Sequence, residues 1–243
     1  MGIRERKERE KGARREEIIN AAETIFFDKG FAVATMDEIA DRAELSKGTL
    51  YLYYRSKEDL YIATALRGWE ILRRMFAEAA STGEHPLKLL SNIGNAYFTY
   101  FKQHRNYYRM SYYLGNANIH SQVSEEMMGE CMESDKKIWD IVSSAVQQAI
   151  DEGMMREGIV ALEAGVMLWA NSDSLMRLMD HDEKGWLELM GLDLENLLRK
   201  SNRLLIEGML TDKGKRKLAQ LFEDVNDFFP RRQSGNNEKK RKL

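Results

Sequence analysis

The chain has 243 residues, of which 43% are hydrophobic and 31% charged, with two prolines and seventeen glycines. This composition excludes collagen-like, low-complexity and largely disordered chains, and the length fits one large domain or two modest ones. No apolar run approaches the ~20 residues of a membrane-spanning helix, and the charged N-terminus lacks the apolar segment of a secretory signal. We therefore expect a cytoplasmic protein with no membrane partner. A single cysteine, Cys131, excludes an intrachain disulfide and a zinc cluster of cysteines.

The charge is unevenly distributed along the chain. Residues 58–229 carry 27 acidic and 19 basic side chains, whereas residues 1–57 are nearly balanced and residues 230–243 carry six basic side chains and one acidic one. Because an acidic segment is repelled by nucleic acid, any contact with DNA should involve an end of the chain.

The N-terminal part of the chain contains a series of helix signals. Apolar residues at helical spacing predict a first helix over about residues 13–29, and Gly30 is typical of a helix stop. Three polar N-caps follow, at Thr35 for a helix over about 36–43, at Ser46 for about 47–53 and at Ser56 for about 57–80. The T-x-x-E pattern at Thr35 also predicts a capping box.

The rest of the chain is predicted to be helical as well, which makes the fold class all-α. The apolar residues keep helical spacing, and β-branched clusters bounded by turn pairs are missing. Further helices are expected at about residues 86–104, 106–113, 121–152, 161–180, 194–210 and 215–229. The first fifteen residues mix basic and acidic side chains. They either extend the first helix or form a mobile arm that follows the DNA backbone or a minor groove, and the alternative is a solvated charged extension without DNA contact.

The two short helices match a helix-turn-helix. They are joined by a link of about three residues, with the small Ala40 and Ala43 at their crossing and Leu45 and Leu50 available to fill it. In such a motif the first helix holds the second so that the N-terminal end of the second enters a major groove. Ordinary helical packing is the alternative reading of this geometry.

The tip of the second helix carries residue types suited to reading DNA. Lys47 can donate to guanine or to a phosphate, Gly48 removes bulk where backbone meets groove, and Thr49 offers a hydroxyl or a methyl group. Tyr51 lies one turn further on, whereas Tyr54 is expected to be a packing residue.

Residues 35–61, which read TMDEIADRAELSKGTLYLYYRSKEDLY, resemble the DNA-binding segment of the TetR family of bacterial transcription regulators. The likeness extends over about residues 13–71. It implies that DNA is contacted by Thr35, Met36, Lys47, Gly48, Thr49, Tyr51, Tyr53 and Lys57. Within that set, the resemblance assigns phosphate to Thr35 and Lys57 and backbone contact to Tyr53, while Leu52 departs from the usual pattern of the family.

The resemblance also implies the domain organisation, an N-terminal three-helix DNA-binding domain before a larger helical ligand-binding and dimerisation domain. We expect a charged N-terminal arm (1–12), a helix-turn-helix domain (13–74), a ligand-binding and dimerisation domain (75–229) and a basic disordered tail (230–243). A single helix-turn-helix reads few base pairs, so a homodimer with recognition helices ~34 Å apart is expected. The family's helix order places the dimer surface on the helices at about 161–180 and 194–210.

Eight of the chain's aromatic residues lie between Tyr97 and Tyr113. They either fill a helical core or line an apolar cavity in which tyrosine hydroxyls orient a ligand. The expected ligand is a small apolar or aromatic organic molecule. Its expected contacts are Tyr97, Phe101, Tyr108, Tyr112, Met132, Trp139 and Trp169.

Catalysis is not expected, because the four histidines lack metal-ligand spacing and no nucleophile elbow, phosphate loop or dinucleotide fingerprint is present. The sequence therefore predicts a transcriptional regulator without catalytic residues, metal or cofactor, and specifically a repressor that a ligand releases from its double-stranded DNA operator. One alternative is an activator, or a regulator that needs the ligand as co-repressor. An alternative of another class is a cytosolic helical carrier or adaptor that no longer binds DNA.

Overall fold

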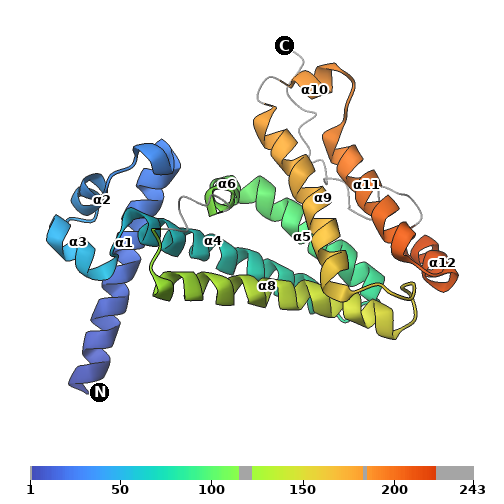
Figure 1. Ribbon diagram of the computed structural model, residues 1–243, viewed down its shortest axis with the longest axis horizontal. Helices are drawn as coiled ribbons and strands as arrows, with labels where there is room; N and C mark the ends of the chain where they lie inside the picture. Colours follow the sequence, from blue (N-terminus) through green and yellow to red (C-terminus); the bar gives the residue numbers. More distant parts are fainter. Residues whose placement is uncertain (1, 115–121, 183–184, 223–243) are drawn as a thin grey trace, which may run out of the picture. The chain divides into compact units, whose positions relative to one another are not determined.

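Every regular element of the described chain is a helix. The computed structural model describes residues 2–114, 122–182 and 185–222. Its helices, labelled in Figure 1, are α1 (Ile3–Val33), α2 (Met36–Arg42), α3 (Lys47–Tyr53), α4 (Lys57–Ala80), α5 (Pro86–Gln103), α6 (Arg105–Leu114), α8 (Glu125–Asp151), α9 (Ala161–His181), α10 (Trp186–Leu189), α11 (Leu194–Met209) and α12 (Asp212–Leu221). The predicted all-α class is confirmed. None of the helices in the described ranges combines the length and the apolar character that crossing a membrane requires.

The chain divides into two compact units. The first unit contains residues 1–73 and 102–137, and the second contains residues 74–101 and 138–243. Both α4 and α8 begin in the first unit and end in the second. The functional boundaries expected near residues 12, 74 and 229 stay predictions, and the expected basic tail at 230–243 lies outside the described residues.

The three helices after α1 begin at the N-caps predicted from sequence. The Thr35 hydroxyl accepts from the Glu38 amide at 3.3 Å, and the Glu38 carboxylate accepts from the Thr35 amide at 3.2 Å. The Ser46 hydroxyl accepts from the Thr49 amide at 3.1 Å, and Ser56 caps α4 in the same way. Local hydrogen bonds between side chain and backbone thus set the start of α2, α3 and α4.

The first helix is longer than predicted. It begins at Ile3 rather than near Ala13, so the charged N-terminal residues extend α1. Arg, Lys and Glu are good helix formers, and the pair between Arg6 and Glu10 at 2.7 Å stabilises this N-terminal segment of α1, which has no apolar face. The helical dihedrals break at Gly30, whose φ of 74° is readily accessible only to glycine.

Two elements near the C-terminus also differ from expectation. The single-turn helix α10 was not predicted, because one turn shows no periodicity. The Asp182 carboxylate accepts from the Trp186 amide at 2.7 Å and so caps this turn. Helix α12 begins at Asp212 rather than near 215, and its predicted continuation from 223 to 229 lies outside the described residues.

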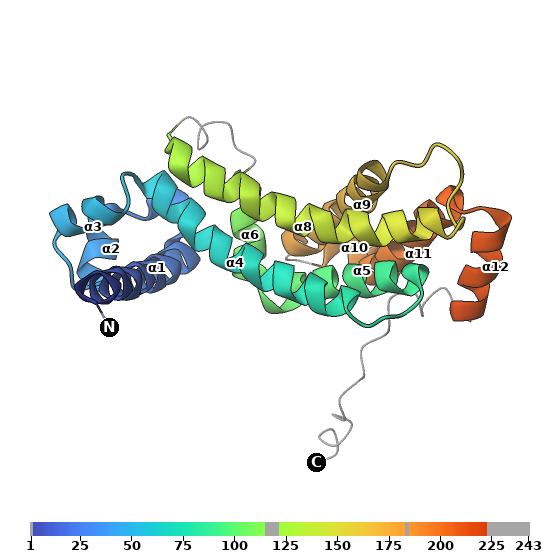
Figure 2. The same ribbon diagram turned by 90° about the horizontal axis from the view of Figure 1, so that it is seen from below.

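Three aromatic rings pack the end of α1 against α4 within the first unit. The ring centroids of Phe26 and Tyr61 lie 5.0 Å apart in an edge-to-face arrangement, and those of Phe31 and Tyr61 lie 4.9 Å apart. The Tyr61 hydroxyl donates to the Met110 carbonyl of α6 at 3.2 Å. Figure 2 shows α1, α2 and α3 gathered at the start of α4.

A second group of contacts joins α1, α4 and α6. A Cβ added at Gly68 would lie 2.7 Å from three atoms of the Tyr107 side chain, so the absence of a side chain allows α4 and α6 to touch. The Tyr107 hydroxyl donates to the Glu23 carboxylate at 2.6 Å, and Arg67 donates to the same carboxylate at 2.8 Å. We call Glu23, Arg67, Gly68 and Tyr107 the three-helix joint.

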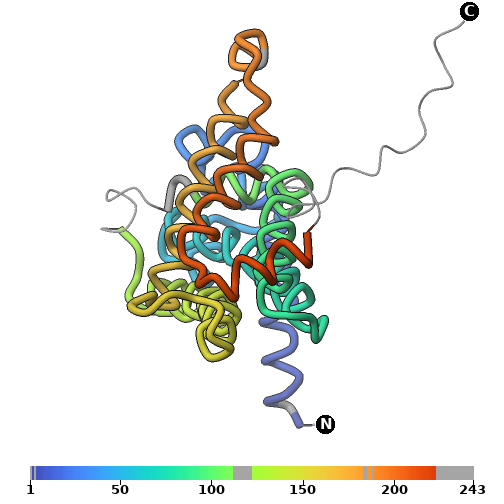
Figure 3. Tube along the Cα trace, turned by 90° about the vertical axis from the view of Figure 1, so that its right-hand side faces the viewer, coloured from blue at the N-terminus to red at the C-terminus, as the bar shows by residue number. Residues whose placement is uncertain are grey.

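Helices α9 and α11 pack against each other in the second unit, where Figure 3 shows them running side by side. The Asn171 amide donates to Ser201 and to Asn202 at 2.9 Å, and the buried Asn202 amide donates to Ser172 at 2.8 Å. Because these polar groups satisfy one another only in one alignment, they fix how the two helices are positioned along each other.

The three-helix joint predicts opposite effects for two glycine substitutions. Gly68→Ala should lower the free energy of unfolding by about 1–3 kcal/mol, because the new Cβ overlaps the pinned Tyr107 ring. Gly129→Ala in α8 should raise it by about 0.5–1 kcal/mol, because Gly129 has open space around it and alanine is the better helix former. Urea denaturation of the two variants measures both. Equal effects would show that the joint is not tightly packed.

Candidate nucleic-acid interface

A tight turn sets the crossing of α2 and α3. Glu44 in this turn has a φ of 56°, the left-handed conformation that non-glycine residues rarely adopt. The turn is closed by hydrogen bonds from the Glu44 amide to the Asp41 carbonyl at 3.1 Å and from the Leu45 amide to the Ala40 carbonyl at 2.9 Å. Because the turn reverses the chain within a few residues, the two short helices can pack on each other.

Buried apolar side chains hold the motif together. Ile39 and Leu50 are fully buried, and Ala40 is 1% exposed at the predicted crossing. Tyr54, which ends α3, is 4% exposed, which confirms its expected packing role. Burial raises the pKa of Tyr54 to about 12, so its hydroxyl stays protonated at neutral pH.

The opposite face of α3 is open to solvent. Tyr51 is 42% exposed and Leu52 is 85% exposed, although both are large and apolar enough to be buried. A Cβ added at Gly48 would meet a single atom, the Ser46 hydroxyl oxygen, at the ordinary contact distance of 3.9 Å. Packing inside the described chain therefore does not require a glycine at this position, although glycine is a poor helix former.

Two of the expected base-reading side chains already have polar partners. The Lys47 ammonium lies 2.7 Å from the Asp37 carboxylate in an exposed ion pair, and the hydrogen bond to Asp37 raises the pKa of Lys47. The Thr49 and Ser46 hydroxyls lie 2.7 Å apart. Since exposed ion pairs contribute little to stability, this pair holds the Lys47 ammonium only weakly.

The remaining residues expected at DNA lie at the start of α2, at the end of α3 and at the start of α4. The Thr35 hydroxyl belongs to the capping box of α2, Met36 is 7% exposed, and Tyr53 is half-buried. The Lys57 ammonium donates to the Phe31 carbonyl at 2.8 Å and to the Ala34 carbonyl at 3.0 Å. It also lies 4.4 Å from the centre of the Phe31 ring. An ammonium has three donors, so one remains for a phosphate.

Three of the expected ligand residues come together in the second unit. The Trp139 and Trp169 rings meet edge to face with centroids 5.8 Å apart. The Trp169 indole donates to the Tyr97 hydroxyl at 3.1 Å, and that hydroxyl donates to the Asp173 carboxylate at 3.0 Å. Burial of Tyr97 raises its pKa well above the usual value. We call Tyr97, Trp139, Trp169 and Asp173 the aromatic cluster.

The other expected ligand residues are spread over both units. Phe101 is buried in the second unit, whereas Tyr108 is buried in the first. Met132, also in the first unit, is 67% exposed, and the side chain of Tyr112 lies outside the described residues. Residues that the sequence groups into one expected ligand site thus have different surroundings in the structure.

Asp173 belongs to the aromatic cluster but is not among the ligand contacts expected from sequence. It is 7% exposed and accepts from Arg177 at 2.7 Å as well as from Tyr97. The signal that could have found it is an acidic residue on a helix otherwise rich in apolar side chains, because buried carboxylates need partners.

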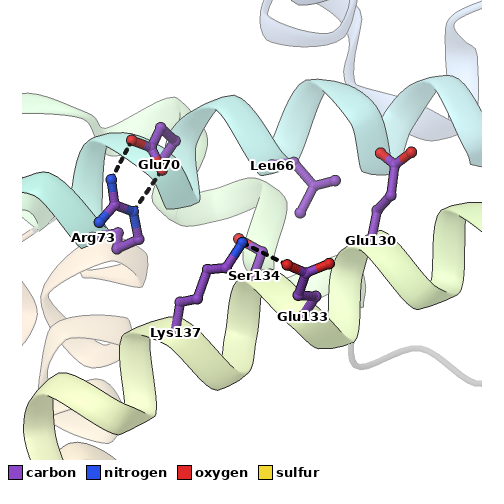
Figure 4. Close-up of a pocket in the computed structure, with 7 residues that line it drawn as sticks. All are labelled: Leu66, Glu70, Arg73, Glu130, Glu133, Ser134 and Lys137. Carbon is purple, nitrogen blue, oxygen red and sulfur yellow. Dashed lines mark hydrogen bonds and ion pairs between the residues drawn. The ribbon is translucent and has the colours of Figure 1, made fainter.

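An open hollow of about 560 Å³ lies between α4 and α8 in the first unit. Figure 4 shows its charged lining, with Glu70 paired to Arg73 on α4 and Glu133 paired to Lys137 on α8. A second open hollow, of about 300 Å³, lies in the second unit beside Ile141. Neither of these hollows is lined by the residues expected to bind a ligand.

Comparison with known proteins identifies the segment that carries the motif. Residues 18–64 match the family model described as bacterial regulatory proteins, tetR family. The chain is 29% identical over 165 residues to the HTH-type transcriptional activator FasR of Mycolicibacterium smegmatis, a match covering 66% of this chain and 74% of that protein. It is 32% identical over 87 residues to the HTH-type transcriptional repressor KstR2 of the same organism, covering 35% of this chain and 42% of that protein.

The fold has solved counterparts as well. The crystal structure of the transcriptional regulator FadR from Bacillus subtilis in complex with stearoyl-CoA matches 80% of this chain and 98% of its own, with a TM-score of 0.60 and 20% identity. At this identity the likeness concerns the fold alone.

The expected family and the helix-turn-helix are thereby confirmed, and the matched family is one of regulators and not of enzymes. Residues 18–64 thus form a DNA-binding segment of the tetR family of bacterial regulatory proteins.

Proposed function

We propose that the chain is a homodimeric repressor whose two α3 helices read a double-stranded DNA operator, and that a small organic ligand releases it. In this proposal residues 13–74 bind DNA, and residues 75–229 bind the ligand and form the dimer. A protein that acts on bacterial DNA works in the cytoplasm.

The observation that carries the proposal is the exposed face of α3. Its tip presents Gly48, which the packing of the described chain does not require, next to the donor groups of Lys47 and Thr49. A helix without a Cβ at this point can approach the floor or the wall of a major groove more closely. Tyr51, exposed one turn later, is then placed to meet a thymine methyl or a phosphate.

Gly48→Ala separates DNA reading from folding. We expect unchanged or slightly higher thermal stability, because the new methyl group meets only ordinary contacts. Affinity for DNA should nevertheless fall by about tenfold or more, because one misfitted base-pair contact costs ~1–3 kcal/mol. The probe is a duplex enriched by wild-type protein from a randomised library, and binding is followed by fluorescence anisotropy.

Gly129→Ala is the matched control, since it adds the same methyl group to an open position of α8. It should bind the enriched duplex as the wild type does. If Gly48→Ala also binds like the wild type, Gly48 does not face DNA. If the wild type enriches no sequence from the library, the carrier alternative replaces the repressor.

The surface of the α9–α11 pair supports a dimer. Apolar side chains remain exposed along both helices after they have packed on each other, among them Leu162 and Val166 of α9 and Leu197 and Leu204 of α11. Leu198 and Met209 of α11, in contrast, are buried within the chain. The apolar residues of α11 thus supply one buried side and one exposed side, and the exposed side suits a second copy.

Leu197→Glu with Leu204→Glu should convert the dimer into a monomer of about 28.2 kDa. Burying the two carboxylates would weaken association by roughly 100-fold or more. Sedimentation velocity measures the mass, and Met132→Glu, which changes an exposed methionine of α8, is the control expected to stay dimeric. A double variant that still sediments as a dimer would exclude this surface.

The aromatic cluster is the proposed ligand site. The Tyr97 hydroxyl already exchanges hydrogen bonds with Trp169 and Asp173, so an entering polar group can compete for them while the rings hold an apolar portion. Helix α4 runs from Lys57, at the helix-turn-helix, to Ala80 in the second unit. A ligand that displaces α4 would therefore change the position of α3.

Ligand and DNA should each weaken binding of the other by the same factor, since linkage is reciprocal. Stearoyl-CoA is the first probe, because a protein of similar fold has been solved with it. A tenfold weakening corresponds to ~1.4 kcal/mol of coupling. Coenzyme A without an acyl chain is the control and should have no effect. Equal effects of both compounds would contradict an apolar ligand.

Activation is the second candidate, because the relative FasR is an activator whereas KstR2 is a repressor. A promoter containing the enriched duplex, fused to a reporter gene, distinguishes them. Repression predicts lower expression when the protein is present, and activation predicts higher expression.

A further inference from the structure

The N-terminal half of α1 is a helix with no core to pack against. Residues 4–14 are exposed, and the first buried side chain is Ile18. At ~1.5 Å per residue, the helix extends roughly 20 Å before it reaches the packed part of the first unit. Figure 1 shows this half of α1, in dark blue, projecting beyond α2 and α3.

The basic side chains of this segment lie on two opposite faces of α1. Arg4, Lys7, Lys11 and Arg15 follow one another at spacings of three or four residues, so they lie along one face of α1. We call these four residues the basic stripe. Arg6 and Arg9 lie on the opposite face, because successive residues turn by ~100°.

The cations of the stripe are available to a partner. Arg4, Lys7 and Lys11 are exposed and form no ion pair or hydrogen bond with any described residue. Off the stripe, the guanidinium of Arg6 is neutralised by Glu10. Glu8 lies on the same face, so the four cations of the stripe and this one carboxylate give that face a net charge of +3. Most of the net positive charge of residues 4–15, which contain seven basic and three acidic side chains, is therefore on one face of the helix.

The inner end of the stripe lies near the C-terminal end of α3. Burial raises the pKa of Tyr54, the residue that ends α3, and the positive charge of Arg15 acts against this rise. The Nε atom of Arg15 is buried and has no hydrogen-bond partner among the described residues. Tyr53, which precedes Tyr54, is one of the residues expected to contact DNA backbone.

We propose that the basic stripe binds the phosphodiester backbone of the duplex next to the base pairs that α3 reads. This inference rests on the proposed DNA-binding function. From Arg4 to Arg15 the stripe spans ~17 Å, and phosphates of one strand recur every ~3.4 Å along the duplex axis. The stripe is thus long enough to meet several phosphates in succession, and it adds affinity that does not depend on base sequence.

The test compares two variants that remove the same charge from the same segment. Lys7→Gln with Lys11→Gln removes two cations from the stripe, and Arg6→Gln with Arg9→Gln removes two from the opposite face. Glutamine retains helix propensity, which circular dichroism checks. Binding to the enriched duplex and to a scrambled duplex of 40 base pairs is measured over a salt series.

Affinity falls as salt rises, so the slope of log affinity against log salt concentration is negative. The stripe variant should make this slope less steep by about 2 for each bound chain, because each lost phosphate contact removes ~0.9 from its magnitude. It should weaken both duplexes about equally, by roughly tenfold or more near physiological salt. The opposite-face variant should change the slope by less than half as much.

The outcomes distinguish this inference from the function on which it rests. Equal slopes for the two variants would overturn the stripe, because net charge alone would then explain the effect. A stripe variant that loses affinity only for the enriched duplex would also overturn it. If the wild type binds neither duplex in a salt-dependent way, the proposed DNA-binding function itself fails.

Discussion

The close approach of α4 and α6 at Gly68 is the constraint on which the first unit depends. With no side chain at Gly68, the Tyr107 ring lies against α4, and its hydroxyl reaches Glu23 of α1 at 2.6 Å. Arg67 satisfies the same carboxylate from α4. Because a partly buried carboxylate needs both partners, moving any one of the three helices leaves a charge or a hydroxyl unsatisfied. Helix α1, which packs against the helix-turn-helix, is thereby held against α4, the helix that continues into the second unit.

The sequence predicts much of the DNA-binding motif because local chemistry determines it. Thr35, Ser46 and Ser56 each cap the helix that follows them, through bonds to backbone three residues away. Such bonds need no tertiary context, so α2 and α3 begin where the caps place them. The same holds for Gly30, where a positive φ interrupts α1. The exposed residues at the tip of α3 follow from these boundaries and from the 3.6-residue period.

Contacts between distant residues could not be predicted in this way. Glu23 and Tyr107 are 84 positions apart, and Tyr97 and Asp173 are 76 apart, so no local pattern joins them. For the same reason, aromatic spacing grouped Tyr108 with Tyr97, although they belong to different units. The sequence alone does not predict the extension of α1 to Ile3, because a helix held by charge pairs on a solvated surface has no apolar period.

In the proposed complex, two α3 helices occupy major grooves of one duplex. Methylation interference on the enriched duplex distinguishes the grooves, because N7 of guanine lies in the major groove and N3 of adenine in the minor groove. We expect two groups of guanines whose methylation at N7 prevents binding, with centres about one helical turn, ~34 Å, or a multiple of it apart. A single group of such guanines, or interference confined to adenine N3, would show that two α3 helices do not occupy major grooves.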